Sequence, residues 1–141
     1  MKLIQKELKI RPKAKGFHLI TDEVSSRLPE LSDIERGIAF LNLKHTSASL
    51  TMNENADPDV RTDLESIFSR IVPPNEPWYT HTLEGSDDMP AHAKSSMIGA
   101  GLTIPVTSGR FNLGTWQGIY LCEHRNNGGV RSLVVTVIAE G

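Results

Sequence analysis

Three of the five histidines stand where a strand, a loop or a helix could present a side chain at the rim of a fold. His45 ends an apolar run, His81 lies in a long polar segment, and His92 falls in the first turn of a predicted helix. Neutral imidazoles bind zinc and similar divalent metals, and three of them with an open position would make a catalytic type of metal site. The spacing matches no recognised metal motif, so local hydrogen bonding by each histidine is the alternative.

Carboxylate and amide groups accompany these histidines in the sequence. Asp87 and Asp88 precede His92 by about one helical turn, where an aspartate can orient an imidazole as a general base or support it as a metal ligand. Helix capping is the alternative, and it would use one of the two aspartates but not both. Glu54 and Asn55 stand between a polar strand face and a helix start, and we interpret them as functional rather than as caps.

A second set of polar residues belongs to the C-terminal part of the chain. Gln117 and Glu123 share one face of a predicted strand with two branched apolar residues. A charged glutamate on such a face needs a partner, and Arg131, after the next turn, is the natural one. An ion pair between Glu123 and Arg131 is therefore the structural alternative to a catalytic role for Glu123. Trp116 is either a core residue or a platform on which a ring stacks.

Several reaction classes lack their sequence signature. The chain has no phosphate-binding loop, no dinucleotide fingerprint and no nucleophile elbow, so triphosphate hydrolysis and serine hydrolysis have no support. Cys122 has no evident activating base, which argues against a thiolate nucleophile. Lys94 and Ser95, together with Arg131, could hold a phosphate group.

Composition limits the class of protein. The 141 residues are 38% hydrophobic and 23% charged, which is typical of a globular chain, and we expect residues 1–141 to form a single domain. A net charge of −2 argues against a nucleic-acid or membrane-surface binder. One cysteine excludes an intrachain disulfide, and the charged N-terminus lacks the apolar core of a signal peptide. We therefore expect a cytoplasmic protein that does not enter a membrane.

The pattern of apolar residues predicts the elements that must position these side chains. Asp57 as N-cap and Pro58 as the first helical residue open a helix with a continuous apolar stripe that ends before Pro73-Pro74. Polar and apolar residues alternate strictly over Ser47–Asn53, which predicts a strand with one solvent-exposed face. A second long helix is expected from residues 87–98, closed by Gly99, and a short one after Thr21. Further strands are expected at residues 4–10, 17–20, 37–43, 102–106, 111–113, 116–123 and 130–138, with hairpin turns at 107–110 and 126–129. Two or three helices among antiparallel strands define an α+β fold.

Three groups of motifs, in this order, resemble the YjbQ family almost from end to end. The first is His45-Thr46-Ser47-Ala48-Ser49-Leu50-Thr51 with Asn53-Glu54-Asn55 and Asp57-Pro58. The second is Asp87-Asp88-Met89-Pro90-Ala91-His92 with Lys94-Ser95-Ser96, and the third is Gly114-Thr115-Trp116-Gln117-Gly118-Ile119 with Glu123-His124-Arg125.

The resemblance implies a small antiparallel α+β protein that assembles as a homotrimer, with a weak thiamine-phosphate synthase activity ascribed to some members. It also implies that His45, His81 and His92 lie near a polar pocket that holds a divalent metal, zinc or magnesium. Glu54, Asn55, Asp88, Gln117, Glu123 and Arg131 match the family pattern as well. The expected function is that of an enzyme acting on a small phosphorylated or diphosphate substrate. The alternatives are a metal- or metabolite-binding trimer without turnover and a trimer in which the polar residues only stabilise subunit contacts.

Overall fold

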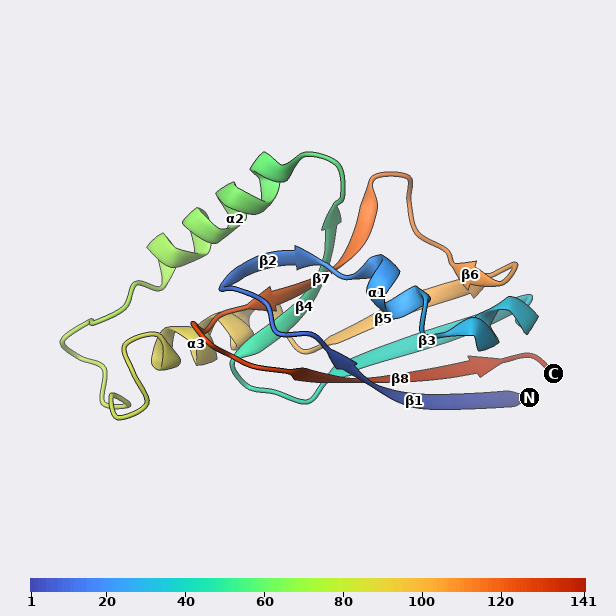
Figure 1. Cartoon of the computed structure of the whole chain (residues 1–141), viewed down its shortest axis with the longest axis horizontal. Coiled ribbons are helices and arrows are strands. Elements are labelled where there is room, and N and C mark those ends of the chain that lie inside the picture. Colours follow the sequence, from blue (N-terminus) through green and yellow to red (C-terminus); the bar gives the residue numbers. More distant parts are fainter.

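The computed structural model describes residues 1–141 as two antiparallel sheets with helices against one of them (Figure 1). The five-stranded sheet has the order β1-β8-β3-β5-β6, and the three-stranded sheet has the order β2-β7-β4. The strands are β1 Lys2–Ile10, β2 Gly16–Leu19, β3 Arg36–Leu43, β4 Ala48–Glu54, β5 Gly101–Thr107, β6 Arg110–Phe111, β7 Gln117–Glu123 and β8 Arg131–Ala139. The helices are α1 Thr21–Ser25, α2 Pro58–Ile71 and α3 Asp88–Ile98, with a 3-10 turn at Pro29–Asp33. The predicted α+β fold with antiparallel strands is confirmed.

The main core lies between the two sheets. Alternate residues of each strand enter it: Ala39 and Leu41 from β3 face Ile119 and Leu121 from β7 across a cluster of 21 buried residues. The other face of β7 carries Tyr120 and Cys122, which form a smaller cluster with Phe17, supplemented by residues of α2 and α3. The molecule therefore has three layers, with the three-stranded sheet in the middle.

Helix α2 begins as predicted, because the side chain of Asp57 accepts a hydrogen bond from the backbone N–H of Asp59 at 2.9 Å. Its apolar stripe is only partly covered. Leu64 and Phe68 pack on the smaller cluster, whereas the side chains of Ile67 and Ile71 remain 50% and 56% exposed. Figure 1 shows α2 beyond β2 and β7, on the side away from β1 and β8. No helix in the structure is both long enough and apolar enough to span a membrane.

Two expected turns have different outcomes. Ser108 and Gly109 both adopt positive φ and close the β5–β6 hairpin, as predicted. The turn at residues 126–129 does not close a hairpin, because β7 belongs to the three-stranded sheet and β8 to the five-stranded sheet. This turn instead carries the chain from one sheet to the other.

The prediction that one face of β4 is exposed to solvent is wrong for the first residues of the strand. Ser49 is fully buried, and its hydroxyl lies 2.8 Å from Nε2 of His124. Helix α3 packs over the start of the strand, where the Ser95 hydroxyl donates to the Ala48 carbonyl at 2.9 Å. Only Asn53, near the other end, is exposed.

Candidate metal centre

His81, Asp88 and His92 converge at the N-terminal end of α3. Asp88 and His92 are four residues apart and share one face of the helix. The loop that precedes α3 brings His81 to the same place, with its ring centroid 5.3 Å from that of His92. The Oδ2 atom of Asp88 lies 2.6 Å from Nε2 of His81 and 3.0 Å from Nε2 of His92. One potential ligand atom from each of the three residues lies within 4.8 Å of the others.

The tautomer of His92 is set by its second ring nitrogen. Nδ1 lies 2.8 Å from the carbonyl oxygen of Thr46, which can only accept, so Nδ1 carries a proton. In the neutral ring Nε2 then presents a lone pair to the Asp88 carboxylate. Two lone pairs at this distance repel each other unless a proton or a cation lies between them. A backbone carbonyl that holds the outer nitrogen is also the usual support of a metal-binding histidine.

Asp88 is oriented by Arg125. The carboxylate is buried, and its Oδ1 accepts a hydrogen bond from Nη1 of Arg125 at 2.8 Å, which leaves Oδ2 for the two histidines. Burial opposes ionisation of Asp88, but the hydrogen bond from His81 and the neighbouring positive charges outweigh it and lower the pKa of this carboxyl. The sequence analysis named Arg125 only as part of a family motif, and its contact with Asp88 was not predicted, because nothing local marks a partner 37 residues away.

Neither aspartate caps α3 through its side chain. Oδ2 of Asp87 accepts from the backbone N–H of Asn126 at 2.7 Å, and Oδ1 lies 3.5 Å from Nη2 of Arg125. Nη2 of Arg125 also donates to the Glu84 carbonyl at 2.8 Å. The capping alternative is therefore wrong for both residues, and these contacts fix the end of the loop that carries His81.

His45 does not join the other two histidines, contrary to the expectation of three imidazole ligands in one site. Its Nε2 accepts a hydrogen bond from the backbone N–H of Ser132 at 2.8 Å, which occupies the lone pair a metal would need. Its Nδ1 faces Nη1 of Arg131 at 3.3 Å. Burial and the positive charge of Arg131 lower the pKa of His45, so the ring stays neutral. Within the chain, Asp88 takes the place expected for the third histidine.

The predicted ion pair between Glu123 and Arg131 is confirmed. Nε and Nη2 of Arg131 donate to the two carboxylate oxygens of Glu123 at 2.7 and 2.6 Å, and both side chains are buried. Arg131 is therefore not open to a phosphate, and Glu123 faces no open site. Ser95 is committed to the Ala48 carbonyl.

Lys94 has no hydrogen bond or ion pair and is 1% exposed. Burial lowers the pKa of this amine, and the nearby charge of Lys15 lowers it further. Cys122 is also buried, and burial raises the pKa of its thiol to about 12, which agrees with the prediction that it is no nucleophile.

The remaining predicted residues form a second group at the far end of the three-stranded sheet. In the β4–β7 register Glu54 pairs with Gln117, whereas Ala48 pairs with Glu123. The ends of a strand of this length are about 20 Å apart. This end has an open recess of about 470 Å³, to which Glu54, Trp116 and Gln117 all contribute, and Trp116 is 68% exposed.

Local hydrogen bonds account for three members of this second group. The Glu54 carboxylate accepts from the backbone N–H groups of Ala56 and Asp57 at the start of α2. Nδ2 of Asn55 donates to the carbonyls of Thr115 and Gln117. Oε1 of Gln117 accepts from the Gly114 N–H at 3.1 Å. Glu54 thus does accept hydrogen bonds at the start of α2, the capping role that was not expected from the sequence.

Fold and site together define a small α+β protein with a paired antiparallel architecture and a His–Asp–His centre. The chain belongs to the UPF0047 YjbQ-like family. The model of this family, described as "UPF0047 protein YjbQ-like", matches residues 6–140. A UPF0047 protein YjbQ of Salmonella typhimurium is 52% identical over 136 residues, which cover 96% of this chain and 98% of that protein. A UPF0047 protein of Synechocystis is 40% identical over 96% of this chain and 92% of its own length.

Solved structures show the same fold. A YbjQ-like protein of unknown function from Sulfolobus solfataricus superimposes with a TM-score of 0.86 at 25% identity, covering 99% of both chains. An uncharacterized YjbQ/UPF0047 protein from Clostridium acetobutylicum gives a TM-score of 0.82 at 34% identity, covering 94% of this chain and 99% of that one. The resemblance predicted from the motifs is therefore confirmed at the level of the family.

Proposed function

We propose that the protein is an enzyme that acts on a small phosphorylated or diphosphate substrate and holds a divalent metal ion between His81, Asp88 and His92. The observation that carries this proposal is the contact of one Asp88 oxygen with two imidazole nitrogens, one of which must present a lone pair when neutral. A proton on His92 or a cation held by these atoms removes the repulsion, and the solvent-accessible position of the two histidines favours the cation. Arg125 behind Asp88 and the Thr46 carbonyl behind His92 are the supports that such a centre requires.

The donor set favours zinc over magnesium. Two imidazoles and one carboxylate suit zinc and similar metals, whereas magnesium takes oxygen ligands and keeps several waters. The side chains of His81 and His92 are 44% and 32% exposed, so the centre is accessible from solvent. A bound divalent ion would supply positive charge for a phosphate oxygen or for a diphosphate leaving group.

The surroundings favour the proposed metal, rather than side chains, as the group that would receive a phosphate. Arg131 and Ser95 are engaged in buried hydrogen bonds, and Lys94 is buried away from solvent. None of the three residues predicted to receive a phosphate is therefore free to do so in this conformation. A thiamine-phosphate synthase-like transfer, which expels pyrophosphate, is one reaction of the proposed class.

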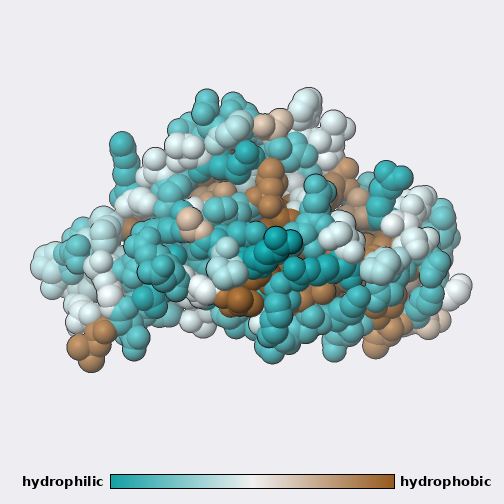
Figure 2. Space-filling view, in the orientation of Figure 1, coloured by the Kyte–Doolittle hydropathy of each residue, from teal (hydrophilic) through white to brown (hydrophobic).

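We propose that the chain assembles as a homotrimer. The outer face of the five-stranded sheet supports self-association, because Leu3, Ile38, Phe40 and Ile138 are large apolar residues that remain between 38% and 68% exposed. Leu3 and Ile38 both pair with Ile138 in the register, so these side chains are neighbours. Figure 2 shows apolar residues on a mostly polar surface near the end where both termini lie. The proposed location is the cytoplasm, consistent with a single buried cysteine.

Metal analysis tests the central claim. Purified protein loaded with zinc and dialysed is expected to retain one ion per chain, and Asp88→Asn and His92→Ala are expected to retain none. His45→Ala and His18→Ala are the matched controls and keep the ion. Unchanged zinc in Asp88→Asn and His92→Ala would remove the metal site.

Turnover separates an enzyme from the second candidate, a metal- or metabolite-binding protein without catalysis. The accessible centre favours the enzyme. Zinc-loaded protein is assayed for release of phosphate or pyrophosphate from small monophosphates and diphosphates, including a pyrimidine methyl diphosphate with thiazole phosphate. Activity that disappears in Asp88→Asn supports an enzyme. Zinc binding without any turnover supports the binding protein, and activity that survives loss of both histidines belongs to a contaminant.

A further inference from the structure

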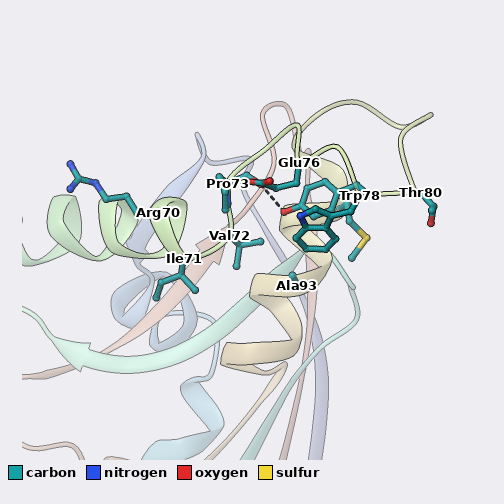
Figure 3. Close-up of a pocket in the computed structure, with 10 residues that line it drawn as sticks. Arg70, Ile71, Val72, Pro73, Glu76, Trp78, Thr80 and Ala93 are labelled. Carbon is teal, nitrogen blue, oxygen red and sulfur yellow. Dashed lines mark hydrogen bonds between the residues drawn. The ribbon is translucent and has the colours of Figure 1, made fainter.

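A pocket of about 660 Å³ opens between the end of α2, the following loop and α3. Its volume is in the range of small-molecule sites, and its lining is largely apolar, as is usual for them. Ile71 and Val72 line one side, Trp78 lies opposite them, and Ala93 of α3 lies beneath the indole (Figure 3). Glu76 is at the edge, whereas the Arg70 guanidinium extends away from the opening.

Contacts within the loop hold Trp78 and Tyr79, on one side of this pocket, in place, although Trp78 is not buried. The Tyr79 hydroxyl donates to the Pro73 carbonyl at 2.7 Å, and its backbone N–H donates to the Glu76 carbonyl at 3.0 Å. The Trp78 ring packs edge-on against Tyr79 with centroids 4.7 Å apart, yet Trp78 remains 72% exposed. The loop therefore presents an indole that its own contacts position and that no other part of the chain covers.

The pocket adjoins the proposed metal centre. A second recess, of about 320 Å³, has Glu76, Tyr79 and Met89 in common with the pocket, and it has His81 in its wall. Met89 follows Asp88 directly in α3. A molecule seated between Trp78 and Ala93 can thus extend past Tyr79 toward His81.

We propose that this pocket holds an aromatic or heteroaromatic ring of the substrate while its phosphate arm reaches the cation at His81, Asp88 and His92. This inference rests on the proposed function and names the substrate class. A flat ring suits an exposed indole face above an apolar floor. The half-buried Glu76 carboxylate makes no hydrogen bond within the chain, so it is open to accept one from a ring with an N–H or amino donor at its edge.

Calorimetry on zinc-loaded protein tests the pocket with benzyl phosphate and methyl phosphate, which share the anion and differ in the ring. Benzyl phosphate is expected to bind at least about tenfold more tightly, the scale of one stacking contact. Trp78→Ala and Ala93→Leu, the second of which fills the pocket, are expected to remove this preference and leave methyl phosphate binding unchanged. Leu83→Ala is the matched control, because Leu83 lies in the same loop, is 97% exposed and lines neither recess.

The outcomes separate this inference from the proposed function. Equal binding of the two phosphates, or a preference for benzyl phosphate that survives in both pocket variants, overturns the inference. The metal proposal is not affected by that result as long as the protein retains zinc. A wild-type chain that binds no zinc overturns the proposed function and the phosphate arm with it, and Trp78-dependent binding of benzyl alcohol then shows whether the ring site stands alone. If Ala93→Leu instead changes the sedimentation coefficient with no ring preference in the wild type, the surface is a contact between copies and the inference is wrong.

Discussion

Glu123 and Arg131 form a bidentate ion pair that joins two sheets which share no strand pairing with each other. Glu123 ends β7 in the three-stranded sheet, and Arg131 begins β8 in the five-stranded sheet. Arg131 also donates to the Ser47 carbonyl at 3.3 Å, and the same Glu123 carboxylate accepts from the Arg125 N–H at 3.1 Å. This pair is therefore a structural link between the layers, close in sequence to the residue that orients Asp88.

Glu123→Gln is expected to lower the free energy of unfolding by about 3 kcal/mol, because it leaves the Arg131 charge buried without a counterion. Urea unfolding followed by circular dichroism measures the change. Glu140→Gln is the control, since Glu140 pairs with Arg36 at the surface, where the side chains are 51% and 73% exposed. We expect that control to leave the stability almost unchanged, because solvent screens a surface pair. A loss below about 1 kcal/mol in Glu123→Gln would contradict the assigned role.

Gly128→Ala is expected to destabilise the protein by about 1–3 kcal/mol. A Cβ at this position would lie 2.4 Å from Oε1 of Glu123, and the ion pair prevents the carboxylate from moving aside. Gly114→Ala serves for comparison, because its Cβ would meet nothing closer than 3.7 Å. Thermal unfolding of both variants gives the result, and equal melting temperatures would show that the carboxylate can shift freely.

Stability is expected to fall as the pH drops below about 6.5, through His124. Burial, with the charges of Lys94 and Arg131, lowers the pKa of His124 from 6.5 to about 3. Between these two pKa values the unfolded chain binds a proton at His124 that the folded chain does not bind. The contribution of His124 to stability is therefore fully present above about pH 6.5 and is lost progressively toward pH 3. Between about pH 6 and pH 5 the loss should approach about 1 kcal/mol per pH unit.

His124→Gln tests the source of that slope, because the amide can still bond to Ser49 but does not titrate. The variant is less stable at neutral pH and is expected to show a flatter dependence on pH in the same interval. Denaturant midpoints at the two pH values are compared with those of the wild type. An unchanged slope in the variant would assign the proton to other groups.

His92 is expected to carry its proton on Nδ1 in the zinc-loaded protein, since Nδ1 donates to the Thr46 carbonyl. Nitrogen chemical shifts of the ring, measured in uniformly labelled protein, identify the tautomer. His18→Gln removes another imidazole signal and helps the assignment without touching the centre. A proton found on Nε2 would exclude metal coordination through that atom.

The parts of the fold that could be predicted are those with local causes. Asp57 and Pro58 start a helix through contacts with their immediate neighbours, and Gly99 ends one with a positive φ that its own backbone permits. The strand at Ser47–Asn53 was located correctly but its exposure was not, because burial of Ser49 depends on α3 and His124, which are distant in sequence.

In the candidate site, too, the features with local causes could be predicted and those that depend on distant residues could not. His81 and His92 were selected by residue type and position, and the spacing of Asp88 and His92 on one helix face made their contact predictable. Arg125 and Thr46 could not be found in this way, because only the folded chain brings them within hydrogen-bond distance of Asp88 and His92. His45 does not meet His81 and His92 within the chain for the converse reason, since a backbone N–H from Ser132 takes its lone pair and no sequence pattern reports such a donor.

The position of β8 in the five-stranded sheet has a consequence for synthesis on the ribosome. β8 lies between β1 and β3, although it follows β1 to β7 in the sequence. Until it emerges, β1 has no partner and the nascent chain exposes the unpaired backbone groups of β3 that β8 will cover. The five-stranded sheet therefore cannot form before residues 131–139 have left the ribosome, and until then the incomplete sheet is prone to association with other chains.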